Sequence, residues 1–77
     1  MQVDIIKQRT NGRVVKWWAN GERVRCLRDA AEKVIARRES IGNKDKGLVV
    51  LIKDSHGSLE KVEKRWWDGE TAKVEKG

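Results

Sequence analysis

Basic and tryptophan side chains recur along the first third of the chain, where they could together bind a polyanion. Arginine's planar guanidinium matches phosphate groups and base edges, and an indole ring offers a flat surface on which a base can stack. The chain has 18 Lys and Arg against 12 Asp and Glu, a formal net charge of +6 and a pI near 9.8. Because most of the arginines precede residue 40, we expect any anion site to lie in the N-terminal half.

The tryptophans form two adjacent pairs, Trp17 with Trp18 and Trp66 with Trp67, and they are the only aromatic residues. Neighbouring residues of a strand point to opposite faces, so one member of each pair should be buried and the other partly accessible. Two explanations stay open. In the first, the indoles fill a small core; in the second, an outward indole beside basic residues stacks a base or anchors a partner.

The arginines at positions 9, 13, 23 and 25 fall on three neighbouring predicted strands, so strand alternation could bring several of them to one face. A charged strand face can equally be a solvated surface with no ligand. The predicted nucleic-acid contacts are Arg9, Arg13, Lys16, Trp18, Arg23, Arg25 and Arg65. Arg37 and Arg38 are interpreted instead as surface residues that complement the dipole at the end of a helix.

Few residues in the sequence support a catalytic role. His56 is the only histidine and lies in a predicted turn with no assigned partner, so we interpret it as a solvated turn residue rather than a general base. Cys26 has no histidine nearby in sequence and is predicted to be a small buried hydrophobic residue. One Cys and one His cannot supply a zinc shell. We therefore predict a protein that is not an enzyme, with no catalytic residue, metal site or cofactor.

Composition also predicts the number of domains and the cellular compartment of the protein. The 77 residues make one domain, 1–77, which is expected to be a monomer or a homodimer. A single cysteine and the lack of an evident leader peptide are typical of a reducing, cytoplasmic protein. The longest apolar run, Leu48–Ile52, is far too short to span a bilayer, so no membrane association is expected.

An internal repeat predicts the architecture. An Ile-Ile-Lys segment at residues 5–7, one turn before the first tryptophan pair, is matched by Leu-Ile-Lys at residues 51–53, one turn before the second pair. We interpret the repeat as two β-meanders joined by a helix. The predicted fold is a single α+β domain in the order βββ-α-βββ, with one helix packed across an antiparallel sheet. Its parts are a first meander at 1–27, a helix at 29–41 and a second meander at 47–76.

Turn residues predict where the strands of the first meander begin and end. Asn11 with Gly12, and Asn20 with Gly21, favour tight hairpin turns. The segment Glu22–Leu27 alternates in polarity like a strand, which would put Arg23 and Arg25 on one face. Helical spacing from residue 21 onwards is compatible with a longer helix, so a start near 21 or near 29 stays open.

The predicted helix has its own signals. Asp29 is the expected N-cap, and Gly42 with Asn43 should end the helix. Its apolar stripe would consist of Ala30, Ala31, Val34, Ile35 and Ile41. The unbroken apolar run that follows is predicted to be a central strand covered on both faces.

Residues 12–38 resemble the arm-binding domains of phage integrases and the plant ethylene-response DNA-binding domains. The resemblance rests on a meander followed by a helix, with, in order, Gly12, Trp17, Ala19, Asn20, Gly21, Leu27, Ala30 and Ala31. It implies a meander laid in the major groove, with strand arginines and a tryptophan on DNA. Arg28 and Asp29 stand where those families have a glycine and an aromatic residue, and the second meander has no counterpart in them.

The sequence thus predicts a small, basic, non-enzymatic nucleic-acid-binding protein. Its strand arginines would contact phosphate, and an outward tryptophan would contact bases. One alternative is a protein-interaction module that binds an acidic protein surface or self-associates. Another is a stable scaffold, natural or designed, with no ligand.

Overall fold

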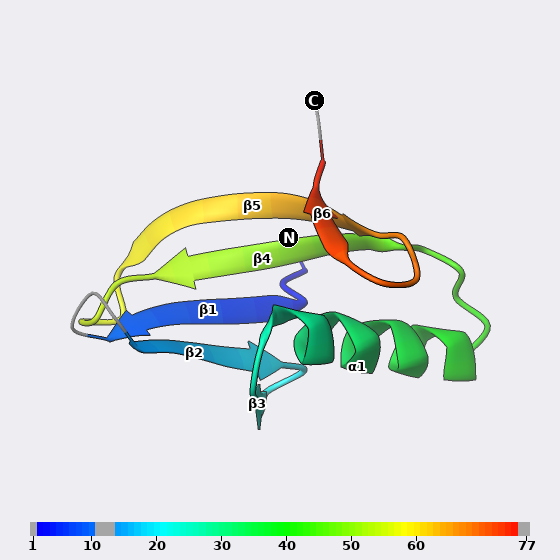
Figure 1. Cartoon of the computed structure of the whole chain (residues 1–77), viewed down its shortest axis with the longest axis horizontal. Helices are drawn as coiled ribbons and strands as arrows, with labels where there is room; N and C mark the ends of the chain where they lie inside the picture. The colour runs from blue at the N-terminus through cyan, green and yellow to red at the C-terminus, as the bar shows by residue number, and fades with distance from the viewer. Residues whose placement is uncertain (1, 11–13, 76–77) are drawn as a thin grey trace.

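The computed structural model describes residues 2–10 and 14–75, which form a six-stranded sheet with one helix against it (Figure 1). Its elements are β1 (Ile5–Thr10), β2 (Val14–Ala19), β3 (Glu22–Val24), α1 (Leu27–Ser40), β4 (Gly47–Lys53), β5 (Leu59–Trp67) and β6 (Ala72–Val74). The predicted order of three strands, a helix and three strands is confirmed. The order across the sheet is β3-β2-β1-β4-β5-β6.

The first meander is held by tight hairpin geometry. β1 pairs antiparallel with β2, and β2 pairs antiparallel with β3. Asn20 and Gly21 join β2 to β3 with φ angles of 51° and 81°. Two positive φ angles in succession are what a two-residue type I′ turn requires, and Asn and Gly accept them most readily. The other predicted turn, at Asn11 and Gly12, lies outside the described residues.

The two meanders meet at the centre of the sheet, where β1 and β4 run parallel with Ile5 opposite Val50. All other neighbouring strands are antiparallel. Each meander therefore starts at the centre and steps outwards to its own edge. Superposing one on the other requires a half-turn about the strand direction, which exchanges the two faces of the sheet. Trp17 and Trp66 are equivalent in the repeat, yet they point to opposite faces.

Helix α1 begins at Leu27, two residues before the predicted start, and its N-cap is Cys26 rather than Asp29. The Cys26 backbone is extended, with φ −158° and ψ 172°, and its Sγ accepts a hydrogen bond from the Asp29 backbone N–H at 3.5 Å. Asp29 instead lies in the first turn, where its carboxylate complements the helix dipole. The expected third strand to Leu27 is also wrong, because β3 ends at Val24.

The end of α1 agrees with the prediction. Gly42 has a φ of 77°, and its N–H donates to the Glu39 carbonyl at 3.1 Å. The Asn43 N–H donates to the Arg38 carbonyl at 2.8 Å. These two bonds form a Schellman cap, which needs a residue that tolerates positive φ.

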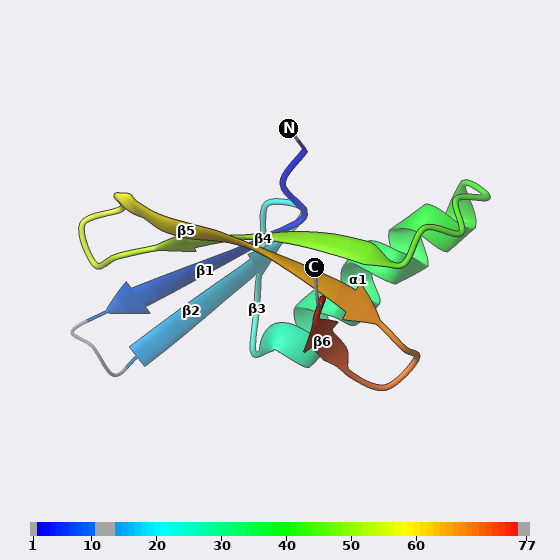
Figure 2. The same cartoon turned by 90° about the horizontal axis from the view of Figure 1, so that it is seen from above.

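Helix α1 packs against one face of the sheet, which we call the covered face (Figure 2). The core between them consists of Ile5, Ala19, Leu48, Val50, Ile52, Trp67 and Ala72 from the sheet and Ala30, Ala31, Val34 and Ile35 from the helix. All of these side chains are at most 8% exposed. The predicted helical stripe is confirmed except for Ile41, which is 76% exposed because it caps the helix beyond its last turn.

A buried ion pair fastens the C-terminal end of α1 to the sheet. Arg38 Nη2 donates to Asp4 Oδ1 at 2.8 Å, and Asp4 Oδ2 accepts from the Val49 N–H at 2.8 Å. Arg38 Nη1 also donates to the Gly47 carbonyl at 2.6 Å. Asp4 is 7% exposed. Arg38 is therefore a structural link between helix and strands, not the surface residue that the sequence suggested.

Candidate functional site

The face of the sheet opposite α1, which we call the open face, is the candidate site. It is defined by strand alternation and pairing register. Its described side chains are Ile6, Gln8, Thr10, Lys16, Trp18, Arg23, Val49, Leu51, Lys53, Leu59, Val62, Lys64, Trp66 and Lys73. These residues come from all six strands, so neither meander builds the face alone.

An apolar row crosses the middle of the open face. Trp18, Ile6, Leu51 and Val62 are successive cross-strand partners on β2, β1, β4 and β5. All four are half-buried. β4 was expected to be covered on both sides, which is wrong: Val49 and Leu51 remain partly exposed because α1 lies on the other face. The row is an apolar surface without a partner in the described part of the chain.

Every charged residue of the open face is a cation. They are Lys16, Arg23, Lys53, Lys64 and Lys73. Among the acidic residues of the described strands, Glu22 and Glu63 lie on the covered face, where they pair with Lys33 and Arg65. Glu60, the extra residue at the register shift in β5, lies 3.9 Å from Arg9 of the covered face. On the open face, Lys73 pairs with a loop residue, Asp68, at 3.1 Å. Charges of one sign on one surface produce a local positive potential that attracts anions.

The second tryptophan pair divides between the faces as predicted. Trp67 is 6% exposed in the core, whereas Trp66 is 49% exposed on the open face. Trp66 lies between Gly47 on β4 and Lys73 on β6. Gly47 has no side chain that could cover the indole, and Lys73 on the other flank is paired with Asp68.

The first pair also divides, although both members are half-buried. Trp17 points to the covered face, with Lys7 Nζ 5.4 Å from its ring centroid. Trp18 points to the open face, with the Arg23 guanidinium carbon 5.6 Å from its ring centroid. Each cation is the cross-strand neighbour of its indole. Such cation–π contacts hold the ring and the charge together on one surface.

A shallow hollow of about 240 Å³ opens beside Trp18 on the open face. It is lined by Ile6, Gln8, Trp18, Gly21, Lys53 and Gly57. Gln8 Nε2 donates to the Asp54 carbonyl at 3.4 Å, which links this amide to the end of β4. The hollow thus combines an aromatic ring, an aliphatic side chain, an amide and a cation.

The predicted contact residues are only partly brought together. Lys16, Trp18 and Arg23 share the open face, as their register requires. Arg9 lies on the covered side, 3.9 Å from Glu60. Arg13 lies outside the described residues.

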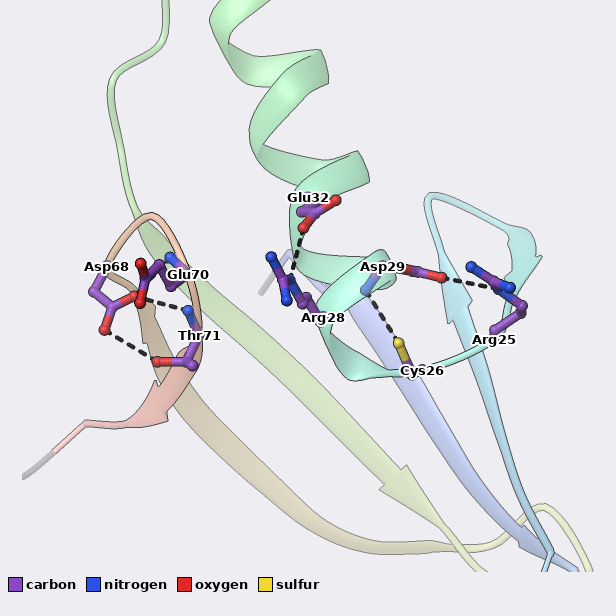
Figure 3. A network of polar contacts seen from close by, with 8 residues as sticks. All are labelled: Arg25, Cys26, Arg28, Asp29, Glu32, Asp68, Glu70 and Thr71. Atoms are coloured by element: carbon purple, nitrogen blue, oxygen red, sulfur yellow. Dashed lines mark hydrogen bonds and ion pairs between the residues drawn. The ribbon is translucent and has the colours of Figure 1, made fainter.

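Arg65 and Arg25 are engaged elsewhere. Arg65 is partly buried on the covered face, 2.6 Å from Glu63, and it donates to the Ala72 carbonyl at 2.6 Å. Arg25 follows β3 instead of belonging to it, so it does not share a strand face with Arg23. Figure 3 shows Arg25 turned towards Asp29, at 3.3 Å in an exposed pair. The prediction that Arg23 and Arg25 share a strand face is therefore wrong, and Arg9 lies on the face opposite Arg23.

Figure 3 also shows the two polar clusters that flank the helix start. Cys26 is exposed at the N-cap, so the prediction of a buried thiol is wrong, because the third strand ends before it. In the β5–β6 turn, Asp68 accepts hydrogen bonds from the backbone N–H groups of Thr71 at 2.7 Å and Glu70 at 2.8 Å. These bonds and the nearby Lys73 ammonium hold the pKa of Asp68 well below its usual range.

The second meander supplies four residues of the candidate site that are not among the predicted contacts, namely Lys53, Lys64, Trp66 and Lys73. A signal for two of them was present: Val62, Lys64 and Trp66 alternate along one strand and must share a face. The excess of arginine near the N-terminus favours a site in the other half of the chain. Lys53 joins this face because β4 pairs with β1, which no local pattern indicates.

Other chemistry has no evident site in residues 2–10 and 14–75. His56 is exposed in the loop between β4 and β5. No group of three or more His, Cys, Asp or Glu in these residues is placed to hold a metal ion. Within the same residues, no helix is both long and apolar enough to cross a membrane.

Comparison of the chain with protein-family models, curated proteins and solved structures finds no match.

Proposed function

We propose that the chain is a non-enzymatic nucleic-acid-binding protein that uses the open face of its sheet. One observation carries the proposal: this face combines two accessible indoles with cations, and no described strand residue on it is acidic. Cations supply the salt-dependent affinity for phosphate. Aromatic rings on the same surface add stacking with bases.

Self-association through the open face is disfavoured by the same charge pattern. Two copies placed face to face would bring Lys16, Lys53 and Lys64 towards like charges, which opposes pairing. An acidic protein could satisfy the lysines. Nucleic acid satisfies them and also offers flat π surfaces to Trp18 and Trp66, so it fits more of the face.

Charge reversal on one strand tests the proposal with a matched control. Lys64 and Lys61 are both exposed on β5 but lie on opposite faces. We expect the wild-type protein to bind a mixed-sequence oligonucleotide with an affinity that falls as salt rises, because each neutralised phosphate releases counterion. Lys64→Glu should weaken binding and reduce the salt slope by about 1. Lys61→Glu should change both much less.

Titration at low salt, followed by fluorescence anisotropy of the oligonucleotide, measures both effects. Absence of binding at low salt, or equal losses for the two variants, would contradict the proposal. Polyglutamate serves as the competing ligand. If it binds as tightly as the oligonucleotide and depends equally on Lys64, the open face is a site for an acidic protein instead.

A further inference from the structure

We infer that the nucleic acid taken by the open face is single-stranded, with one unpaired base in the hollow beside Trp18 and another stacked on Trp66. This inference rests on the proposed function and adds the class of ligand and its path. It follows from the apolar row, from the separation of the two indoles and from the lining of the hollow.

The apolar row separates single strands from duplexes. Trp18, Ile6, Leu51 and Val62 form a half-buried surface that gains stability only against another apolar surface. A duplex keeps the faces of its bases stacked inside and presents mainly phosphate and groove edges. A single strand can turn its base faces onto the sheet while its phosphates meet the lysines.

The positions of the two indoles determine the path of the bound single strand across the sheet. Three strand spacings separate β2 from β5, roughly 14 Å, and four residues along β5 separate Val62, in the Trp18 row, from Trp66, again roughly 14 Å. The indoles are therefore anchored roughly 20 Å apart on the diagonal. They cannot hold the same base. Lys64 lies between Val62 and Trp66 on this path, where it would meet a phosphate between the two bases.

The twist of the sheet agrees with a path that crosses the strands. Figure 2 shows β2 and β5 running at a large angle to each other, so that the sheet is strongly twisted. A flexible single strand can follow such a surface. A straight duplex would touch it along only part of the diagonal.

The hollow provides the more structured of the two base positions. The Trp18 ring and Ile6 offer apolar contact, Gln8 offers an amide, and Lys53 offers a charge for the adjacent phosphate. Arg23 acts as a positioning residue, because its guanidinium lies over the Trp18 ring at 5.6 Å before any ligand arrives. A ring that is already ordered loses less conformational entropy when a base stacks on it.

The experiment compares a single-stranded oligothymidylate with a mixed-sequence duplex, each about 12 nucleotides long and at one low salt concentration. Intrinsic fluorescence reports directly on stacking, because the protein has 4 Trp and no Tyr. We expect the single strand to bind more tightly than the duplex and to quench this fluorescence. Oligothymidylates of about 4 nucleotides or longer should be able to saturate the quenching.

Tryptophan variants locate the contacts. Trp66→Ala removes an exposed ring and should lower single-strand affinity roughly 5- to 150-fold, the range for one stacked base. Trp18→Leu should have a similar effect while keeping an apolar side chain in the row. Trp17→Leu, one residue away on the other face, is the control and should leave affinity within about 2-fold, less than the loss of one stacked base. Circular dichroism checks that each variant is folded.

The outcomes separate this inference from the proposed function. Equal binding of single strand and duplex, with no loss in Trp66→Ala, would overturn the single-strand inference and leave nucleic-acid binding intact. Binding only to the duplex would overturn it as well. If neither nucleic acid binds, both the inference and the proposed function fail.

Discussion

The two faces of the sheet are made by the same strands, but one face is covered by the helix and the other is open. Along β4, Leu48, Val50 and Ile52 are buried in the core of the covered face, whereas Val49 and Leu51 between them remain partly exposed. The alternating residues are similar in hydrophobicity, so local sequence does not explain the difference. What differs is the cover: a domain of this size buries a limited fraction of its surface, and its one described helix lies on one face.

The two faces also differ in the signs of the charged residues that they carry. Acidic and basic residues are mixed on the covered side, where Arg65 pairs with Glu63 and Lys33 with Glu22. The open face carries lysines and an arginine beside indoles. The cations of the open face therefore come from both halves of the sequence, although most of the net positive charge lies in the first half.

The largest effect is expected where the cover is fastened to the sheet. Asp4→Ala removes one partner of the buried pair with Arg38 and leaves a guanidinium without its carboxylate. We expect a loss of about 3 to 5 kcal/mol in the free energy of unfolding, measured by urea denaturation. Glu32→Ala, in an exposed pair with Arg28 on α1, is the control and should cost about 0 to 1 kcal/mol. Similar losses for both variants would show that the buried pair does not hold the helix.

A matched pair of substitutions on β4 compares the faces directly. Leu48 is 1% exposed on the covered face, and Leu51 is half-buried on the open face. Leu48→Ala should lower the free energy of unfolding by about 2 to 5 kcal/mol, because it leaves a cavity. Leu51→Ala should cost clearly less, since solvent already reaches that site. Equal costs would mean that the open face is covered in solution, and sedimentation would then reveal an oligomer.

The smallest effect concerns the turn that follows the second tryptophan pair. The backbone N–H groups of Thr71 and Glu70, together with Lys73, favour the charged form of Asp68 and lower its pKa in the folded state. The stability it contributes is present above the unfolded value of about 3.9 and is lost as pH falls through the folded value.

Asp68→Asn keeps the side-chain oxygen and removes the charge. We expect a slightly lower melting temperature at neutral pH and a shallower decline in melting temperature below about pH 4. Thermal melts at several pH values measure both. A variant with the same acid-side decline as wild type would show that other carboxylates govern this region of pH.

Much of the fold was accessible from local patterns. The order of elements followed from the repeat, the end of α1 from Gly42 and Asn43, and the division of Trp66 from Trp67 from strand alternation. These features depend on neighbours a few residues apart, where backbone preferences act. The start of α1 was less accessible, because a cysteine serves as its N-cap and the third strand is only Glu22–Val24.

The candidate site was only partly accessible. Lys16 and Trp18 were placed on one face by alternation within a strand, and Arg23 joins them through the β2–β3 register. Arg9 and Arg65 were selected by residue type, yet the structure pairs them with acidic residues on the covered side. Lys53, Lys64 and Trp66 belong to the open face because of the contact between β1 and β4, which links residues more than forty positions apart.

The sequence by itself determined the strands, the helix and the alternation that sends one member of each tryptophan pair to each face, since all of these follow from local backbone geometry. Only the tertiary structure decided which face α1 would cover and that β1 and β4 would pair in parallel. The parallel pairing sends equivalent residues of the repeat to opposite faces, and the single helix can bury only one of them. The open face, with Trp18, Trp66 and its cations, is the physical result of those two long-range choices.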